Sequence, residues 1–272
     1  ESPNNNITNC SVYDNTNGIY LDQYSTNNII MNCTVYNNAK HGIYVWRQSH
    51  NIIITSCNAY NNAEYGIYIR FPSDNNNITN CNTYNNTYGI CITGSSNIIM
   101  NCTVYNNAID GIYISGSSNI ITNCDVYNNA IDGIYIWGSS NIITSCDVYN
   151  STNGIYIYKA SNNELMGNTI YDNAYNFGVF GSTIDHFTQY IDPSNTINGK
   201  PIYYLWNEHD ITLNETNNPG FLGLISCTNI TVKNSDVCGI VIIDTTDSTI
   251  SNVSSHDSGN GIYILSSSNN NV

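Results

Sequence analysis

The chain has 272 residues, of which only six are Lys or Arg and twenty are Asp or Glu. The formal net charge of −14 predicts repulsion from nucleic acid and from anionic membrane surfaces, so we expect neither as a partner. No apolar run approaches the roughly 18 residues that a membrane-spanning helix needs, and the opening "ESPNNN" lacks the charged and apolar parts of a secretion signal.

A repeat of roughly 22 residues runs through most of the chain, with the consensus N-I-I-x-N-C-x-V-Y-N-N-x-x-x-G-I-Y-I-x-x-S-S. Internal repeats of this length are typical of solenoids. Asn168 takes the cysteine position in a variant copy, and looser copies begin near Asn229 and Ser248. The cysteines of the seven clearest copies form one series: Cys10, Cys33, Cys57, Cys81, Cys102, Cys124 and Cys146.

The repeat predicts short β-strands joined by bends. Apolar residues such as Ile99, Val104 and Ile112 fall on one side if strands alternate in and out, whereas Gly, Asn and β-branched residues crowd any helical arrangement. Stacked asparagines at the bends would satisfy inward-pointing backbone groups and tolerate left-handed dihedral angles. We therefore predict an all-β, right-handed parallel β-helix (solenoid) of about ten rungs with a lateral β insertion.

Three regions are expected along the chain. Residues 1–182 form rungs one to eight, and residues 229–272 form further rungs that continue beyond the C-terminal residue, because "SSSNNNV" resembles the start of another copy. Residues 183–228 interrupt the repeat and hold three of the five prolines. This interruption is too short and too polar to form a hydrophobic core of its own, so we expect a β excursion packed on the side of the helix.

The copies and the stretch "NTINGKPIYYLWN" resemble the NosD-like parallel β-helix family, of the kind found in archaeal cell-surface proteins. The resemblance covers nearly the whole chain and implies the β-helix fold and a surface location. The same fold module also occurs in carbohydrate-binding and sugar-cleaving proteins. The family name carries a copper label, but the sequence has no cluster of His, Met and Cys that would support it. We expect no metal and no cofactor.

The cysteine series is open to three interpretations: metal ligands, disulfides or packing. A single column offers an ion at most two neighbours in line, and stacked Cβ atoms about 4.8 Å apart exceed the spacing that a disulfide prefers. We favour a structural ladder of buried thiols. Cys227 and Cys238 lie outside the ladder. Cys91 replaces tyrosine in the G-I-Y motif, so we expect it to point outward as a reactive or bridging thiol.

Alternation places the tyrosines of "VY" and "GIYI" on the outside. The first column is Tyr13, Tyr36, Tyr60, Tyr84, Tyr105, Tyr127, Tyr149 and Tyr171. Stacked tyrosines also stabilise a sheet without a ligand, but Trp46 and Trp137 are not needed by the repeat. A platform for glycans or a partner is predicted around the second column: Tyr44, Trp46, Tyr68, Arg70, Tyr113, Tyr135, Trp137, Tyr156 and Tyr158.

Carboxylates recur at rung spacing, as in Asp110 with Asp132 and Asp125 with Asp147, but repetition alone produces such pairs, and we assign no catalytic residue. Two groups of polar residues are candidates for a cleft or a cation site. One lies in rungs two and three, with Lys40, His41, Arg47, His50, Glu64 and Arg70. The other lies in the interruption, with Asp185, His186, Glu208, His209 and Asp210.

Ten N-x-S/T sequons occur, a number that the abundance of Asn, Ser and Thr would produce by chance. Three of them, at Asn9, Asn32 and Asn101, precede inward cysteines and are expected to be accessible for N-glycosylation.

The sequence predicts first a structural or adhesive segment of an extracellular or cell-surface protein. This segment is expected to associate with itself or with other surface proteins in filaments or a surface layer. In such an assembly the rungs of neighbouring copies would stack end to end. The alternative is a carbohydrate-binding or polysaccharide-active module, and a third possibility is copper handling. An enzyme is not expected, although a polysaccharide lyase or hydrolase stays open.

Overall fold

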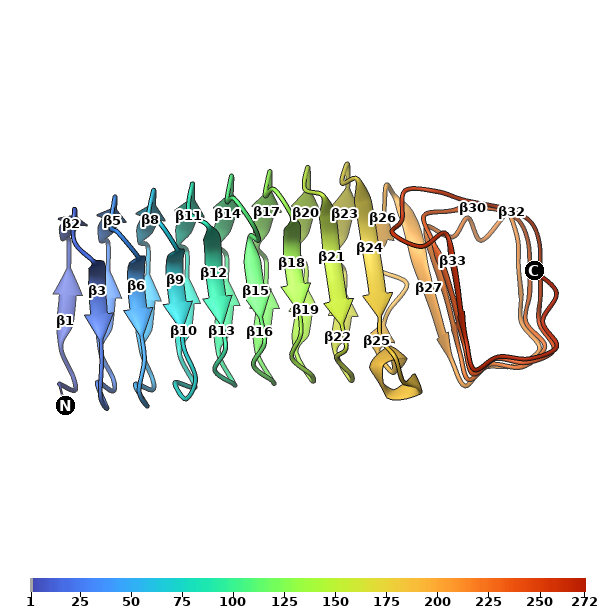
Figure 1. Cartoon of the computed structure of the whole chain (residues 1–272), viewed down its shortest axis with the longest axis horizontal. Helices are drawn as coiled ribbons and strands as arrows, with labels where there is room; N and C mark the ends of the chain where they lie inside the picture. Colours follow the sequence, from blue (N-terminus) through green and yellow to red (C-terminus); the bar gives the residue numbers. More distant parts are fainter. Residues whose placement is uncertain (1) are drawn as a thin grey trace.

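In the computed structural model of the chain, which describes residues 2–272, eight rungs of three strands stack along the long axis of the molecule (Figure 1). Each rung supplies one strand to each of three parallel sheets, named A, B and C below, and together they form the rod. No helix in the described residues is long and apolar enough to cross a membrane.

The strands of the rod are three to six residues long, apart from the two-residue strands at its end. Sheet A contains β1 (Asn6–Thr8), β4 (Ile29–Met31), β7 (Ile53–Thr55), β10 (Asn77–Thr79), β13 (Ile98–Met100), β16 (Ile120–Thr122), β19 (Ile142–Thr144), β22 (Glu164–Met166) and β25 (Tyr190–Ile191). Sheet B contains β2 (Ser11–Tyr13), β5 (Thr34–Tyr36), β8 (Asn58–Tyr60), β11 (Asn82–Tyr84), β14 (Thr103–Tyr105), β17 (Asp125–Tyr127), β20 (Asp147–Tyr149), β23 (Thr169–Tyr171) and β26 (Thr196–Ile197). Sheet C contains β3 (Asn17–Leu21), β6 (His41–Val45), β9 (Tyr65–Ile69), β12 (Tyr88–Ile92), β15 (Ile112–Ile114), β18 (Asp132–Ile136), β21 (Asn153–Tyr158) and β24 (Tyr175–Phe180).

The alternation of the repeat decides which side chains enter the core. Ile99, Val104 and Ile112 point inward from sheets A, B and C of one rung and are completely buried. The same positions of the next rung pair with them in register, so identical residues stack into apolar columns. The predicted inward and outward faces are therefore confirmed.

Asparagines build the corners of the rod in two ways. Asn32 and Asn101 adopt left-handed backbone angles, with φ of 55° and 54°, at the bend between sheets A and B, where both are exposed. Other asparagines point inward and form ladders: Asn97 donates its backbone N–H and its amide to Asn119 Oδ1 at 2.8 and 3.1 Å, and Asn119 donates in the same way to Asn141. Buried backbone groups at the corners are thus satisfied by the next rung.

The cysteine ladder lies inside the same bend. Its thiols are free, and six of the seven are buried while Cys10 is partly exposed. Each Sγ lies near backbone carbonyl oxygens; for Cys57 these are Thr55 O at 3.3 Å and Ile30 O at 3.6 Å. The cysteines therefore pack as small apolar side chains with weak S–H donors.

The rod ends in an incomplete ninth rung, and the chain then reverses. A short 3-10 helix, η1 (Ile184–Phe187), leads into β25 and β26. Asn198 and Gly199, with φ of 48° and 78°, form the hairpin that follows, and the next strand pairs antiparallel with β26. A left-handed Asn-Gly pair is typical of such a tight turn.

After the hairpin the chain forms four further turns, which we call the end unit and which contain two sheets (Figure 1). Sheet D contains β27 (Lys200–Trp206), β29 (Phe221–Ile225), β31 (Ile240–Ile243) and β33 (Ile262–Leu265), all mutually parallel. Sheet E contains β28 (Thr212–Leu213), β30 (Thr231–Val237) and β32 (Thr249–Ser255).

Sheet D covers the end of the rod. One face, with Ile202 and Tyr204, belongs to the core of the rod, and the other face, with Leu222 and Leu224, belongs to the core of the end unit. Tyr204 donates its hydroxyl to Phe187 O at 2.6 Å, which joins β27 to η1. The apolar end of the rod is therefore sealed by the chain itself.

This arrangement differs from the predicted insertion and its boundaries at 182/183 and 228/229. Residues 183–197 belong to rung nine, and residues 200–228 supply β27, β28 and β29 of the end unit rather than an excursion on the side of the rod. Residues 229–272 form further parallel turns, in line with the predicted rungs, but these turns belong to the end unit rather than to the rod. The lateral excursion was not found because the chain reverses at Asn198–Gly199, and this reversal depends on pairing with β26, which the repeat pattern does not encode.

Candidate functional site

The outer face of sheet B carries an unbroken stack of eight tyrosines. Neighbouring rings from Tyr13 to Tyr171 lie 4.8 to 5.2 Å apart and within 17° of parallel. Rings stacked face to face present edges and hydroxyls to solvent, and their apolar faces are covered. This stack stabilises the sheet and offers no ring face to a ligand.

The corresponding column on sheet C is less regular: Cys91 interrupts it in rung four, Gly178 takes the position in rung eight, and the rings of Tyr135 and Tyr156 are tilted by 46°. Its register aligns Tyr20, Tyr44, Tyr68, Cys91, Tyr113, Tyr135 and Tyr156. Rings stack at 4.9 and 5.2 Å before the break and at 5.3 Å after it. At the break, Tyr68 and Tyr113 flank Cys91 on the neighbouring rungs, so their positions lie two rung spacings, about 9.6 Å, apart.

The missing ring leaves a cavity of about 260 Å³, which we call the slot. Its lining residues are Tyr65, Tyr68, Tyr88, Cys91, Thr93 and Tyr113. Tyr65 lies against Tyr68 at 4.5 Å, and Tyr88 meets Tyr113 edge to face at 6.1 Å. The slot is therefore a gap of one ring in an aromatic stack, with two further tyrosines beside it.

Cys91 forms the floor of the slot and behaves as predicted only in part. It is only 3% exposed, and burial, together with the charge of Asp110, raises the pKa of its thiol well above the ordinary value. A buried neutral thiol is a poor nucleophile. Cys91 therefore points outward as predicted, in line with Tyr68 and Tyr113, but the predicted reactive or bridging role is wrong, because the neighbouring tyrosines bury its free thiol.

The slot is uncharged but rich in hydroxyls. Burial raises the pKa of Tyr68 to about 12 and raises the pKa values of Tyr88 and Tyr113, so all three phenols stay protonated at neutral pH. Each phenol can donate and accept a hydrogen bond, as can Thr93. A ligand with apolar ring faces and several hydroxyls would match this lining.

Asp110 and Asp132 lie near the slot but do not line it. Both are 5% exposed, and each already accepts a hydrogen bond: Asp110 Oδ1 from the Asp132 backbone N–H at 3.2 Å, and Asp132 Oδ1 from Asn153 at 2.6 Å. Burial, followed by the charge of Asp132, raises the pKa of Asp110 to about 7. The pair supports the chain corner rather than facing a substrate. Asp125 and Asp147 lie on the outer face of sheet B.

The remaining platform residues are spread over several environments. Tyr44 is only 6% exposed, because His41 and Trp46 pack against it at 4.7 and 5.9 Å. Trp137 is 52% exposed and presents its ring to solvent. Tyr135, Tyr156 and Tyr158 are half-buried and lie against one another. The structure does not gather these residues into one flat surface.

The polar group of rungs two and three is only partly brought together. His41 Nδ1 lies 3.5 Å from Glu64 Oε2, yet burial lowers the pKa of His41 below its ordinary value, so this histidine is neutral at neutral pH. His50 accepts the backbone N–H of Asp74 at 3.0 Å, and Lys40 is exposed. Arg47 and Arg70 both lie over the ring of Trp46.

The residues proposed for a cation in the interruption do not converge. His209 and Asp210 form an exposed pair at 2.9 Å, while His186 lies in η1 and accepts the backbone N–H of Ser182 at 3.1 Å. Throughout residues 2–272, no three His, Cys, Asp or Glu side chains are grouped so that they could hold a metal ion.

One charged network on the end unit escaped the sequence analysis. Asp236 lies 3.0 Å from Lys200 Nζ and 2.9 Å from His256 Nε2, and His256 Nδ1 lies 2.8 Å from Asp257. These residues come from different turns, β27, β30 and the segment after β32, so only the solenoid register joins them.

We expect this network to make the end unit more stable at mildly acidic pH. The hydrogen bond to Asp257 and the charge of Asp236 raise the pKa of His256 above 6.5, so its contribution is fully present below pH 6.5 and is lost as pH rises through the folded pKa. An NMR titration of the imidazole should show this pKa, and Asp236→Asn should lower it. Titration of wild-type His256 at or below pH 6.5 would contradict the assignment.

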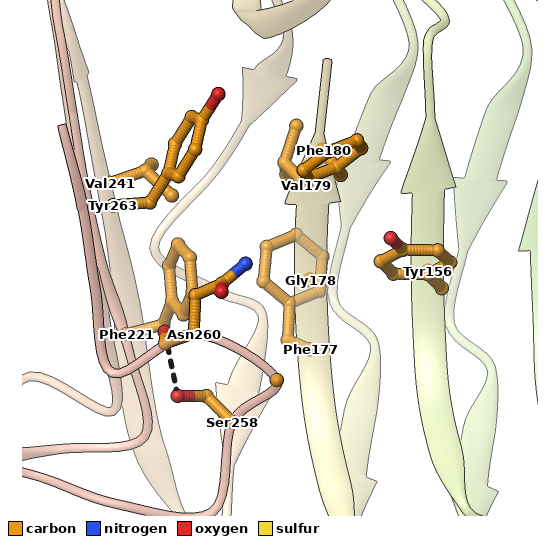
Figure 2. Close-up of a pocket in the computed structure, with 11 residues that line it drawn as sticks. Tyr156, Phe177, Gly178, Val179, Phe180, Phe221, Val241, Ser258, Asn260 and Tyr263 are labelled. Atoms are coloured by element: carbon orange, nitrogen blue, oxygen red, sulfur yellow. Dashed lines mark hydrogen bonds between the residues drawn. The ribbon is translucent and has the colours of Figure 1, made fainter. Parts of the chain in front are cut away.

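A second cavity lies at the junction of the rod and the end unit (Figure 2). Phe177 and Phe180 of β24 face Phe221 and Tyr263 of sheet D across it, and the loop of Ser258 and Asn260 lies beside it. Tyr156 packs over Gly178, where a Cβ atom would lie 2.8 Å from the ring. The volume of about 70 Å³ is far below that of an ordinary ligand site, so these aromatic residues join the two parts.

Comparison with known proteins agrees with this architecture. The family model described as "Right handed beta helix region" matches residues 1–109 and 69–217, and the predicted right-handed coil is confirmed. No curated protein sequence matches the chain.

Several solved structures share the fold at low sequence identity. The A-module of the mannuronan C-5 epimerase AlgE4 of Azotobacter vinelandii is 16% identical with a TM-score of 0.58, over 94% of this chain and 68% of that one. The tailspike protein of E. coli bacteriophage HK620 is 12% identical with a TM-score of 0.56, over 93% and 55%. The periplasmic alginate epimerase AlgG is 17% identical with a TM-score of 0.51, over 90% and 51%.

Proposed function

The chain belongs to the right-handed β-helix family, and we propose that this member binds a polysaccharide along the outer face of sheet C, with one sugar ring in the slot. The observation that carries the proposal is the missing ring at Cys91, between the stacked rings that end at Tyr68 and the stacked pair that begins at Tyr113. In the stack of sheet B each ring face is covered by the next ring, whereas Tyr68 and Tyr113 have no ring between them on the Cys91 rung.

The chemistry of the slot suits a pyranose. The ring of a sugar has an apolar face that can pack against Tyr68 or Tyr113, and its hydroxyls can bond to the protonated phenols and to Thr93. The volume of about 260 Å³ lies just below the usual range for small-molecule sites, so the slot holds one sugar unit rather than a longer segment. Neighbouring units would then lie along the face, toward Trp46 and Arg70 on one side and Trp137 on the other.

The comparisons support this proposal more than the structural or adhesive role that the sequence first suggested. Two of the structural neighbours are named as epimerases of mannuronan and of alginate, which are polysaccharides. End-to-end stacking of rods also loses support, because sheet D covers one end of the rod. We find no observation that favours copper handling.

The proposal is limited to binding. No carboxylate lines the slot, and the Asp110 and Asp132 side chains are already engaged by backbone and amide donors. A polysaccharide ligand fits the extracellular or cell-surface location expected from the sequence. The exposed sequons at Asn9, Asn32 and Asn101 stay predicted modification sites.

A glycan array probed with the full chain tests the proposal. We expect retention on a subset of polysaccharides, followed by chemical-shift changes of labelled tyrosine rings at Tyr65, Tyr68, Tyr88 and Tyr113 when an oligosaccharide is added. Tyr127, in the closed stack of sheet B, is the internal control. Failure to retain any glycan, or shifts spread equally over the tyrosines of sheet B, would overturn the proposal.

A further inference from the structure

Three long turns form a ledge beside the face of sheet C. The turn from sheet C to the next strand of sheet A has seven residues in rungs one to three, at 22–28, 46–52 and 70–76. The same turn has five residues in rungs four to six, at 93–97, 115–119 and 137–141. The longer turns enclose a cavity of about 350 Å³ lined by Gln23, Tyr24, Arg47, Gln48 and Pro72.

Both arginines of the chain lie at this ledge, on the same indole ring. The guanidinium carbons of Arg47 and Arg70 are 4.3 and 4.5 Å from the centre of the Trp46 ring. Arg70 also donates to Tyr44 Oη at 3.0 Å, so its guanidinium group is held in place while the residue stays exposed. A planar guanidinium group fixed in this way can offer two parallel N–H donors to a carboxylate or a sulfate.

At the ledge, Arg70 is the arginine that lacks an ion-pair partner among the described residues. Arg47 forms one long, exposed ion pair with Asp22 at 3.5 Å, and within the described residues Arg70 has no carboxylate partner within 4 Å. Two cations on one ring repel each other, and a chain with only six Lys and Arg residues against twenty Asp and Glu has many carboxylates that could have paired with them. An anion beside Arg70 would supply the missing partner of this guanidinium group, and the Arg47 charge on the same ring would add to the attraction.

We propose that Arg70, with the Arg47 charge nearby, binds the acidic group of a sugar next to the unit held in the slot, so that the polysaccharide is an acidic one. This inference rests on the proposed function. The two sites are adjacent: Arg70 and Thr93 occupy the same outward position on neighbouring rungs, Thr93 N–H donates to Ile69 O at 2.9 Å, and Phe71 N–H donates to Thr93 Oγ1 at 2.8 Å. Thr93 lines the slot itself.

Titration of the full chain with three oligosaccharides of equal length tests the proposal: a neutral one, one that carries carboxylates and one that carries sulfates. The acidic ligands should bind at least about tenfold more tightly than the neutral one, as expected for a charge-assisted hydrogen bond in addition to shared ring contacts. The difference should shrink as salt is added. The tighter of the two acidic ligands identifies the group that the ledge accepts.

Arg70→Gln should abolish the preference for acidic ligands, and Arg47→Gln should weaken it less, because Asp22 already takes part of the Arg47 charge. Lys159→Gln is the matched control: it removes one positive charge from an exposed lysine over the Tyr158 ring, in rung seven. Equal affinity for neutral and acidic ligands, or a preference that survives Arg70→Gln, would overturn the inference while leaving glycan binding in place. A chain that binds none of the ligands would overturn the proposed function as well.

Discussion

Cys91→Tyr should weaken oligosaccharide binding strongly and leave the rod folded. Tyrosine is the residue that most other copies of the repeat carry at this position, and its ring would continue the stack between Tyr68 and Tyr113. The ring faces that the slot now offers would then be covered. Packing of one sugar ring against aromatic faces contributes about 1.5–3 kcal/mol, so the affinity should fall by about tenfold to a hundredfold. Isothermal titration with the best glycan from the array measures the change.

The control for this variant is Asn82→Tyr. Asn82 is exposed on the outer face of sheet B in the same rung, so the substitution adds the same ring away from the slot. It should bind like the wild type, and both variants should unfold at nearly the wild-type temperature. Unchanged affinity of a folded Cys91→Tyr variant would show that the ligand does not use the slot.

Asn119→Ala should destabilise the rod by about 3–5 kcal/mol, because it breaks a buried amide ladder in the middle. Asn119 Oδ1 accepts two hydrogen bonds from Asn97, one from the backbone and one from the side chain, and its amide donates to Asn141. All three residues are fully buried, so no water replaces the lost acceptor. Chemical denaturation monitored by circular dichroism gives the change in the free energy of unfolding.

Asn82→Ala serves as the comparison for the ladder. Asn82 donates to Asn58 Oδ1 at 2.9 Å in an equivalent contact between rungs, but on the solvent side. Water can satisfy the freed group there, so the loss should stay below about 1 kcal/mol. If both substitutions lowered the free energy of unfolding by a similar amount, burial would not be the reason why the inward asparagines stabilise the rod.

The rod was predictable from sequence because the features that build it, alternation within each strand and stacking of identical copies, are contained in a single repeat. Alternation in "CTVYNN" places Cys102 and Val104 inside and Tyr105 outside, and every rung repeats the same choice. Stacking identical rungs then determines the register, so the sheets, the inner asparagines and the tyrosine columns follow from a single copy. The resemblance to β-helix repeats pointed to the same fold.

The end unit and the slot depend on contacts that a single copy does not contain. The direction of β27 is set by its pairing with β26 and by Tyr204 reaching Phe187. Cys91 is an exception to the repeat in the sequence, where a thiol suggests reactivity and the loss of a ring is not apparent. The sequence signal for the slot is the size difference between the Cys91 side chain and the side chains of Tyr68 and Tyr113. This difference predicts a cavity only if the tyrosines of neighbouring rungs are known to stack.

Sheet D contributes side chains to both hydrophobic cores, and this couples the unfolding of the rod to that of the end unit. Solenoids usually unfold in segments, since each repeat contacts only its neighbours. Here the strands of sheet D have one apolar face in each core, so opening either core uncovers apolar surface that also belongs to the other. We therefore expect the rod and the end unit to unfold as linked units, with amide hydrogens of β27 and β29 exchanging together with those of rung eight.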